Sequence, residues 1–529
     1  MLTLVLISGA CTGEGASPDS SGPQVPRGNR GAPCRDLDEL VDRVRRGYMH
    51  GPSPDVSLIP REPNFVGSAA MPPHTGPWDY LTEVPLVLYG PGFIADAGEL
   101  DTPALMVDVA PTLARIVGFE DFPPGDGRVL DQALAGGSRV PRLVVTVVSD
   151  GGGYDALKAH RAAWPFLRSL MRRGTSFPRM SLGSTPSNTP PIHATLGTGV
   201  FPSAHGVTAV KQRDDSGEFI DPWANEDPSK LLAPTLGDLY DRALGNRPLV
   251  GMTATVNWHL GMIGHGSAIS GGDRDQALLL NDQGLPYGNE AFYEIPGVAR
   301  PEELSTLTAD LDRADGAADG EWMGHPLDDL AVRNATPAYT RYQELMLERM
   351  IVEGGYGDDS TADLVYVNFK QPDDAGHKWG MSSSEEGEVL AAQDHELRRL
   401  VRFLDGEVGE RNWVLAITAD HGQMPYPEES GAWAIGGKEM KNDVNAALGE
   451  GAGIVERVTA QGVYVDAEAM ERAGASIRAV ARFLARYTVG DNLKRGSTLP
   501  DSFANRTDER LMDAAIIGRR TVVRGCSGT

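Results

Sequence analysis

The sequence has little cysteine, few aromatic residues and no long hydrophobic run. Only 3 of its 529 residues are cysteine, which excludes a fold held together by many disulfides. The apolar run at its start, MLTLVLISGA, is shorter than the roughly 20 residues that cross a bilayer. Basic residues are outnumbered, with 48 Lys and Arg against 73 Asp and Glu. The resulting formal charge of −25 argues against a nucleic-acid duplex as a partner, because a polyanion is repelled.

What the sequence does contain is typical of a soluble globular protein. Hydrophobic residues make up 41% and charged residues 23% of the chain. The 63 Gly and 37 Pro predict many loops. The length suffices for one large α/β domain with insertions or for two to three ordinary domains. A small anionic substrate can still bind an acidic protein if metal cations neutralise the pocket locally.

The first 33 residues predict a signal-like segment followed by a flexible linker. An apolar run, small residues, Cys11 and a tether rich in Gly, Ser and Pro together resemble a bacterial lipoprotein signal with a lipidated cysteine. The alternative is a shortened secretory signal with an incidental cysteine. Both interpretations predict an extracytoplasmic protein, either secreted or anchored at the cell surface. Membrane anchoring through a lipid on Cys11 is then possible.

Two further cysteines, Cys34 and Cys526, lie near the two ends of the remaining chain. In an oxidising compartment such an isolated pair can form a disulfide that ties the two ends together. Two free, buried thiols are the alternative.

From residue 34 onward, patterns typical of strands and helices alternate. Short apolar, β-branched runs predict buried strands at 85–90, 142–150, 247–256, 363–369, 412–420 and 461–467. Helical patterns occupy 107–118, 154–174, 340–355, 385–407 and 476–488. This alternation predicts an α/β fold with a large, mainly parallel central sheet and helices on both of its faces. Residues 260–336 are rich in Gly and Asp with weak periodicity, which predicts an irregular insertion near the active-site face.

Three of the predicted strands deliver carboxylates and imidazoles at their carboxyl ends. One strand ends at Asp150, another ends at Asp420 followed directly by His421, and a third runs into KQPDDAGH with Asp373 and His377. In an open parallel sheet, ligands gather beyond the carboxyl ends of the strands. A single aspartate there is more often a helix cap, but three such ends together favour a shared metal site. Mixed carboxylate and imidazole ligands suit zinc, with manganese or iron as alternatives.

The candidate nucleophile is Thr189, which precedes two prolines and the apolar stretch IHATLGTGV. This pattern puts its hydroxyl at the start of a helix, where backbone N–H groups favour an anion. A threonine that only caps the helix is the alternative. Its position beside the predicted metal site favours the nucleophile.

These motifs resemble the alkaline phosphatase superfamily. The resemblance is carried by Asp150 at its strand end, the Thr189 segment with TGVFPSAHG, QPDDAGHKWG and TADHG, and it is nearest to the nucleotide pyrophosphatase/phosphodiesterase branch. It implies two divalent ions, best assigned as Zn²⁺, and a threonine nucleophile that contacts one of them. One ion would be held by Asp150, Asp420, His421 and the Thr189 oxygen. The other would be held by Asp373, His377 and a further histidine.

In that family the further histidine comes near the C-terminus, but this chain has no histidine after His421. The stretch HTGPWDYLTEVPLVLYGPG, which begins at His74, resembles the missing family segment moved to the front. The chain is therefore interpreted as a circular permutation with His74 as the sixth protein ligand. Residues 34–140 are the displaced segment and 141–529 the family core, together forming one metallohydrolase domain over 34–529.

The chain also departs from the family pattern. Where the phosphodiesterase branch has a phosphate-binding asparagine, HGVTAVKQRD offers Val210. Lys211 beside it is a candidate substitute, with an ordinary surface lysine as the alternative. His259 and His265 are candidates to line the substrate pocket, with structural histidines as the alternative. The absence of a Lys-x-Arg pair in GMTATVNWHLG favours phosphodiesters over phosphomonoesters, and the lack of Cys-x-Pro-x-Arg argues against a sulfatase.

The resemblance thus implies a hydrolase of small phosphoesters that works through a covalent phosphothreonine at Thr189. Three related activities stay open, namely phosphonate hydrolysis, phosphomonoester hydrolysis and phosphoryl transfer. A non-catalytic, zinc-binding surface lipoprotein is the alternative from another class.

Overall fold

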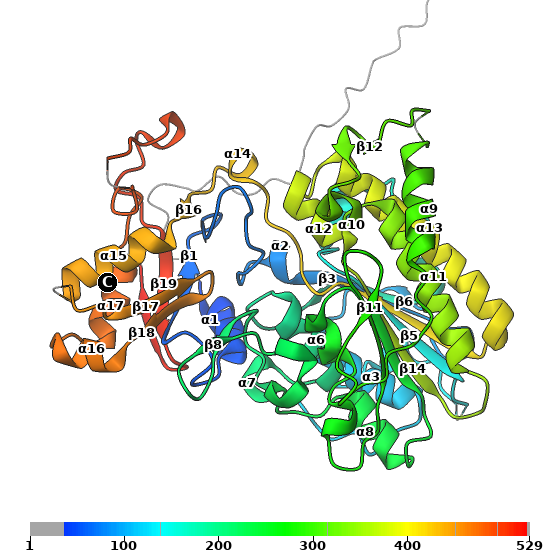
Figure 1. Ribbon diagram of the computed structural model, residues 1–529. Helices are drawn as coiled ribbons and strands as arrows, with labels where there is room; N and C mark the ends of the chain where they lie inside the picture. Colours follow the sequence, from blue (N-terminus) through cyan, green and yellow to red (C-terminus); the bar gives the residue numbers. More distant parts are fainter. Residues whose placement is uncertain (1–35, 138, 315, 450, 495, 526–529) are drawn as a thin grey trace, which may run out of the picture.

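The computed structural model describes residues 36–137, 139–314, 316–449, 451–494 and 496–525. The lipidation predicted at Cys11 and the disulfide predicted between Cys34 and Cys526 fall outside the described residues and stay predictions. Two parts lie side by side (Figure 1), a larger one around a central sheet and a smaller one built mainly from the last part of the chain.

A nine-stranded sheet, in the order β11-β10-β9-β14-β5-β15-β3-β6-β4, forms the centre of the larger part. Only β3 and β11 run against the direction that the other strands share. The strands are β3 Glu83–Tyr89, β4 Gly98–Glu99, β5 Leu143–Ser149, β6 Thr175–Ser181, β9 Val250–Ala254, β10 Gln276–Leu280, β11 Pro286–Tyr287, β14 Asp363–Phe369 and β15 Trp413–Thr418. The predicted mainly parallel sheet is confirmed, and it contains five of the six predicted strands.

Alternate residues of the central strands point into two hydrophobic cores on opposite faces of the sheet. In β5, Val144 and Val148 belong to one core, whereas Val145 and Val147 belong to the other. Helices cover both faces, as predicted. The first face is covered by α3 (Val109–Ile116), α6 (Thr189–Thr198) and α8 (Leu236–Ala243), and the second by α5 (Pro165–Arg173), α11 (Pro337–Gly354) and α13 (Ser384–Leu404).

A second, antiparallel sheet forms the smaller part, and the sequence did not predict it. Its order is β17-β18-β1-β19-β20, with β1 Val56–Pro60, β17 Val455–Thr459, β18 Gly462–Val465, β19 Met512–Ile517 and β20 Thr521–Arg524. The strand predicted at 461–467 therefore exists, but it pairs here and not in the central sheet. The sheet shares a core with α15 (Gly437–Leu448), α16 (Ala467–Arg472) and α17 (Ile477–Leu484).

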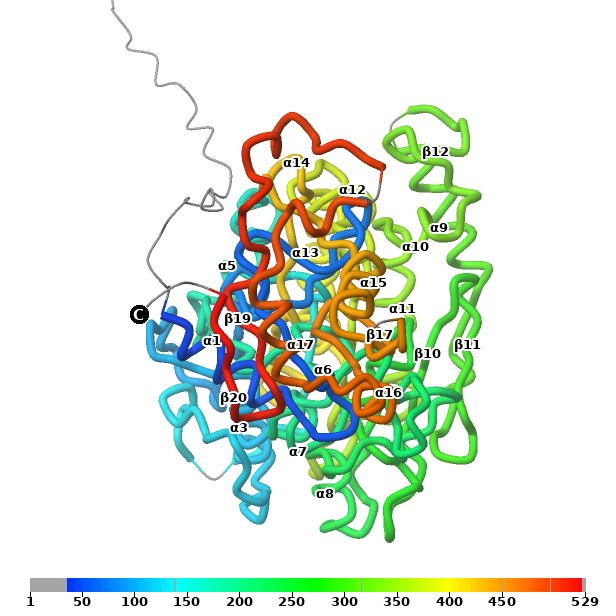
Figure 2. The backbone as a smooth tube through the Cα atoms, turned by 90° about the vertical axis from the view of Figure 1, so that its left-hand side faces the viewer, coloured from blue at the N-terminus to red at the C-terminus, as the bar shows by residue number. Residues whose placement is uncertain are grey.

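The two ends of the described chain lie together in this smaller part. Figure 2 shows β19 and β20 next to α1 (Asp38–Gly47), and β1 pairs directly with β19. Val41 and Val44 of α1 pack in one cluster with Ala514 and Ile516 of β19. Segments from the beginning and the end of the sequence thus share one core.

Two segments differ from the sequence prediction. The helical pattern at 154–174 is divided into α4 (Tyr154–Ala159) and α5, because Pro165 begins a new helix and cannot continue the first. The stretch 260–336, predicted to be irregular, contains β10 and the helix α9 (Pro301–Asp312), which packs against α11. Its Gly and Asp residues lie mainly in connections between these short elements, where they hide the periodicity.

The remaining elements are short. They are α2 Asp79–Thr82, α7 Pro202–His205, α10 Leu330–Asn334, α12 Gln371–Trp379, α14 Pro427–Ser430, β2 Phe65–Val66, β7 Gln212–Arg213, β8 Phe219–Ile220, β12 Glu321–Trp322, β13 His325–Pro326 and β16 Ala434–Ile435. Over the described residues, no helix combines the length and the apolar character that a bilayer crossing requires.

Candidate metal centre

The side chains predicted at the three strand ends meet at the carboxyl edge of the central sheet. Asp150 follows β5 directly, and Asp420 and His421 follow β15. Helix α12 begins two residues after β14 and carries Asp373 and His377 one turn apart. Since β5, β14 and β15 are parallel neighbours, their ends lie next to one another.

Asp150, Asp420 and His421 form an inner donor group that is fully buried. The Nε2 atom of His421 lies 3.4 Å from Asp150 Oδ1 and 3.2 Å from Asp420 Oδ2. The Nδ1 atom of His421 lies 3.0 Å from the Gly422 carbonyl oxygen, so that Nδ1–H donates to it and Nε2 is left with its lone pair. An imidazole oriented in this way, between carboxylates, is typical of a metal ligand.

His74, Asp373 and His377 form an outer donor group. Asp373 Oδ1 lies 3.7 Å from His74 Nε2 and 3.4 Å from His377 Nε2. The ring of His74 also stacks on that of His421, with 3.5 Å between their centroids. His74 Nδ1–H donates to the Ser187 carbonyl oxygen at 2.7 Å, which turns Nε2 towards Asp373. A histidine some 300 residues away in sequence thus completes this group.

Thr189 lies beside both groups at the first residue of α6, as the sequence predicts. Its Oγ1 is 3.4 Å from His421 Nε2. The expected anion site at the helix start is weaker than predicted, because Pro190 and Pro191 have no N–H and the Ile192 N–H donates to Asn188. Positive charge near the hydroxyl must therefore come from elsewhere.

Lys370, which the sequence analysis missed, supplies one such charge. Its Nζ donates to Asp150 Oδ1 at 3.0 Å and to Asp373 Oδ2 at 2.5 Å, and lies 3.5 Å from Thr189 Oγ1. The ammonium group therefore connects the two donor groups next to the candidate nucleophile. Its position directly after β14, three residues before Asp373, was the available signal.

A further set of polar side chains holds the other oxygen of Asp150. His259 Nε2 lies 3.2 Å from Asp150 Oδ2, and the amide nitrogen of Asn368 donates to the same oxygen at 3.0 Å. His193, on α6, contacts Asn368 and donates from Nδ1 to the Thr189 carbonyl oxygen. These contacts fix the orientation of Asp150 and of the start of α6.

The candidate substrate-binding residues have three different surroundings. His259 is completely buried against Asp150, so it does not line an open pocket. His265 pairs with Asp238 at 2.8 Å, away from the donor groups. Lys211 is exposed to solvent and makes no hydrogen bond or ion pair with a described residue.

The donor groups fit divalent metal ions by their chemistry. Asp373 Oδ1 and Asp420 Oδ2 are buried without a hydrogen-bond partner. Burial and the charge of Asp150 raise the pKa of Asp420 well above its ordinary value. Burial and the neighbouring His421 lower the pKa of His74 well below its ordinary value, so the ring is neutral. Crowded carboxylates and neutral imidazoles with free lone pairs form metal sites, and within each group the ligand atoms lie within 4.8 Å of one another.

Glu386 lies on α13 beside this centre, and no described cationic side chain is among the groups that shift its pKa. Its side chain is fully buried, Oε2 has no partner, and Oε1 accepts only a 3.3 Å hydrogen bond from Gln423. Burial and the nearby Asp373 raise the pKa of Glu386 well above its ordinary value. The contribution of Glu386 to stability is therefore complete below the pKa that this carboxyl has in the unfolded chain. It is lost as pH rises from there through the raised pKa of the folded state.

We expect Glu386→Gln to raise the free energy of unfolding relative to wild type by an amount that grows between pH 5 and pH 8. The growth is at most about 1.4 kcal/mol per pH unit. Urea denaturation at several pH values measures it, and Glu388→Gln, exposed on the same helix, is the matched control. A difference for Glu386→Gln that stays constant with pH would contradict the assignment.

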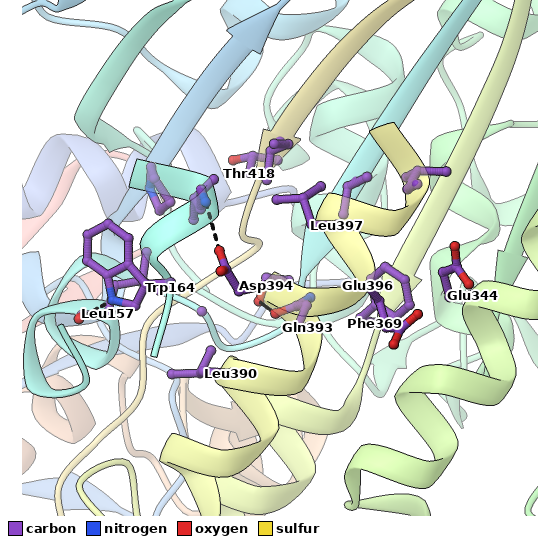
Figure 3. A pocket seen from close by; sticks show the side chains of 17 residues that line it. Leu157, Trp164, Glu344, Phe369, Leu390, Gln393, Asp394, Glu396, Leu397 and Thr418 are labelled. Carbon is purple, nitrogen blue, oxygen red and sulfur yellow. Dashed lines mark hydrogen bonds between the residues drawn. The ribbon is translucent and has the colours of Figure 1, made fainter. Parts of the chain in front are cut away.

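A cavity between the sheet and helices α5 and α13 is not the substrate site. It encloses about 30 Å³ and is lined mainly by apolar side chains, among them Leu157, Trp164 and Leu397 (Figure 3). That volume holds one or two water molecules. The donor groups are most open to solvent at His74 and His377, whose side chains are 14% and 26% exposed.

The model of the type I phosphodiesterase / nucleotide pyrophosphatase family matches residues 144–496, which is well over half of the chain. The chain belongs to this family. The predicted resemblance to the alkaline phosphatase superfamily is thereby confirmed, and the match includes all three strand ends and Thr189.

Relatives within the superfamily carry the name alkaline phosphatase. PhoD of Zymomonas mobilis is 23% identical over 368 residues, covering 64% of this chain and 62% of PhoD. PhoV of Synechococcus elongatus is 25% identical over 333 residues, covering 54% of this chain and 60% of PhoV. The chain thus spans less than two thirds of the length of either relative.

The crystal structure of wild-type alkaline phosphatase PafA has a similar fold. It superposes with a TM-score of 0.51 at 17% identity, covering 72% of this chain and 85% of PafA. At that identity the likeness concerns the fold alone, and it supports the α/β assignment.

Proposed function

We propose that this protein is an extracytoplasmic hydrolase of phosphoric esters that uses two divalent metal ions and forms a covalent phosphothreonine at Thr189. The observation that carries the proposal is the meeting of two donor groups beside one threonine hydroxyl. Membership of a phosphodiesterase family supports it.

In this proposal the inner group and the Thr189 oxygen hold one ion, and the outer group holds the other. Zn²⁺ suits both groups, because each combines carboxylate with imidazole. Two divalent ions bound there would supply Lewis-acid charge to the attacking and leaving oxygens of an in-line displacement.

The side chains around Thr189 have separate roles in the proposed reaction. The Thr189 hydroxyl loses its proton as its oxygen attacks phosphorus, and the bond to the leaving group breaks, so that the departing oxygen takes up a proton and leaves as an alcohol. The phosphoryl group stays on Thr189 until water hydrolyses it, which returns the proton to the Thr189 oxygen. Lys370 Nζ, at 3.5 Å from Oγ1, adds fixed positive charge next to the attacking oxygen. His193 holds the Thr189 backbone through its carbonyl oxygen, so the hydroxyl keeps its direction. Because Asp150, Asp420 and His421 are buried, bulk water is excluded from the space around the inner group.

The arrangement of the chain is also part of the proposal. We infer that 34–529 is one metallohydrolase domain and that 34–140 is a family C-terminal segment moved to the front. Three observations support this permutation. The family match begins at 144, β3 pairs with β15 in the central sheet, and the ends of the described chain share a core. Secretion or lipid anchoring through Cys11 follows from the signal-like first 33 residues.

Phosphodiesters are the preferred substrate class in this proposal. The family name supports diesters, and the lack of a Lys-x-Arg pair removes cationic side chains that a dianionic monoester would need. The names of the relatives favour phosphomonoesters as a second candidate. Phosphonates and phosphoryl transfer to an alcohol stay open in the same metal site.

Metal analysis combined with turnover of bis-p-nitrophenyl phosphate and p-nitrophenyl phosphate separates these possibilities. We expect kcat/KM for the diester to exceed that for the monoester by about ten-fold or more, as the loss of cationic contacts weakens dianion binding. A clear preference for the monoester would replace the diester assignment. Full metal content without turnover of either ester, or of a phosphonate, would favour a non-catalytic zinc-binding lipoprotein.

A further inference from the structure

Three aspartates converge at the edge of the central sheet opposite to the candidate metal centre. Asp241 lies on α8, and Asp273 and Asp275 lie on the loop that leads into β10. One carboxylate oxygen from each lies within 4.8 Å of those from the other two. Figure 1 shows α8 at the lower end of the molecule and α12 of the metal centre near the upper end. The aspartates therefore form a separate group.

Two of these carboxylates are buried without a compensating charge. Asp241 is 4% and Asp275 is 7% exposed. Oδ1 of Asp241 is buried without a hydrogen-bond partner. The environment of the Asp275 carboxylate consists of burial and three other aspartates, with no hydrogen-bond donor among the described residues that shift its pKa. Within the described ranges, no Lys or Arg is among the groups that shift the pKa of Asp241 or Asp275. A buried carboxylate in this state costs stability unless a cation or a proton neutralises it.

The groups around the cluster do not remove this repulsion. The side chain of Asn246, oriented with its nitrogen towards them, donates to Asp241 Oδ2 and to the Gly271 carbonyl oxygen at 3.2 Å each. His265 is already paired with Asp238. Burial and Asp273 raise the pKa of Asp241 to about 7, and burial and Asp238 raise the pKa of Asp275 well above its ordinary value. Without a cation, the carboxyl groups can lie this close together only if some of them stay protonated.

We propose that Asp241, Asp273 and Asp275 bind one Ca²⁺ ion that joins α8 to the start of β10. The donors are carboxylate oxygens, with the Gly271 carbonyl oxygen close by, and no imidazole or thiolate takes part. Oxygen-only sets select hard cations, and Ca²⁺ tolerates an irregular set of six to eight oxygens completed by water, whereas Mg²⁺ demands a regular octahedron. This ion is structural and independent of the proposed hydrolytic activity.

The first test is equilibrium dialysis of the zinc-loaded protein with ⁴⁵Ca²⁺ in buffer that contains excess Zn²⁺. We expect one Ca²⁺ per chain and an affinity that falls about ten-fold or more in Asp241→Asn and Asp275→Asn. Asp215→Asn, exposed and without a hydrogen-bond partner among described residues, is the matched control and keeps wild-type affinity. No bound Ca²⁺ in the wild-type protein, or equal binding by all variants, would overturn the proposal.

Thermal unfolding gives a second measurement, which reports the effect of the ion on stability and not the amount of ion bound. We expect Ca²⁺ to raise the Tm of the zinc-loaded wild-type protein by about 3 °C at saturation and to leave that of Asp275→Asn unchanged. Since asparagine removes like-charge repulsion without changing shape, Asp275→Asn in Ca²⁺-free buffer should be at least as stable as wild type. An equal rise with Mg²⁺ would overturn the assignment to Ca²⁺.

Discussion

Replacing Thr189 with alanine is expected to lower kcat by about 10³-fold or more while the zinc content of the protein stays close to that of wild type. The reason is that the hydroxyl is the proposed attacking group, whereas the inner donor group keeps all its protein side chains in the variant. Steady-state kinetics on bis-p-nitrophenyl phosphate and elemental analysis of the same preparation measure both quantities.

Thr189→Ser is the matched control, because it keeps the hydroxyl and removes only the methyl group. It should retain activity within about ten-fold of wild type and should accumulate a phosphoserine that acid quenching traps. Near-normal hydrolysis by the alanine variant would show that water attacks phosphorus directly, and the covalent mechanism would be wrong.

Replacing His74 with alanine is expected to halve the zinc content and to lower kcat/KM by about 10²-fold or more. His74 is one of three side chains in the outer group, so its loss leaves only Asp373 and His377 of the proposed protein ligands. The inner group keeps all three of its side chains in this variant and should keep its ion. Elemental analysis after gel filtration in metal-free buffer gives the zinc content.

His50→Ala is the control, since His50 is exposed and makes no hydrogen bond or ion pair with a described residue. Excess Zn²⁺ should restore part of the activity of His74→Ala, because a weakened site still fills by mass action. Full zinc content in His74→Ala under metal-free conditions would remove His74 from the ligand set and with it the main functional argument for a permuted chain.

The strand-end residues could be predicted because the edge of a parallel sheet brings sequence-distant positions together. Asp150, Asp420 and Asp373 each follow an apolar strand, and parallel neighbours end at the same edge. His74 could not be found in that way, since its strand β3 is antiparallel to β15. Only the similarity of its surroundings to a family segment indicated its place.

Other residues of the site were missed because their role depends on packing. Lys370, Asn368 and His193 carry no motif of their own, and each acts through a contact with Asp150 or Thr189. His259 was assigned to the substrate pocket, but complete burial puts it behind Asp150. Burial of this kind follows from how η5 (Asn257–Met262) packs on α6, which local sequence does not reveal.

The second sheet was missed for a topological reason. Its strands come from both ends of the chain, with β1 between β18 and β19. Periodicity indicates that a segment is a strand, as it did for 461–467, but not which sheet it joins. The aspartate cluster was missed in the same way, because 32 positions separate Asp241 from Asp273.

The most direct measurement is anomalous diffraction at the zinc edge from crystals of the zinc-loaded protein. We predict two peaks at the carboxyl edge of the central sheet, one about 2.0–2.2 Å from His74 Nε2, Asp373 and His377, and one at that distance from Asp150, Asp420 and His421. A single peak at the inner group, with the His74 ring turned away from Asp373, would contradict the paired-metal site.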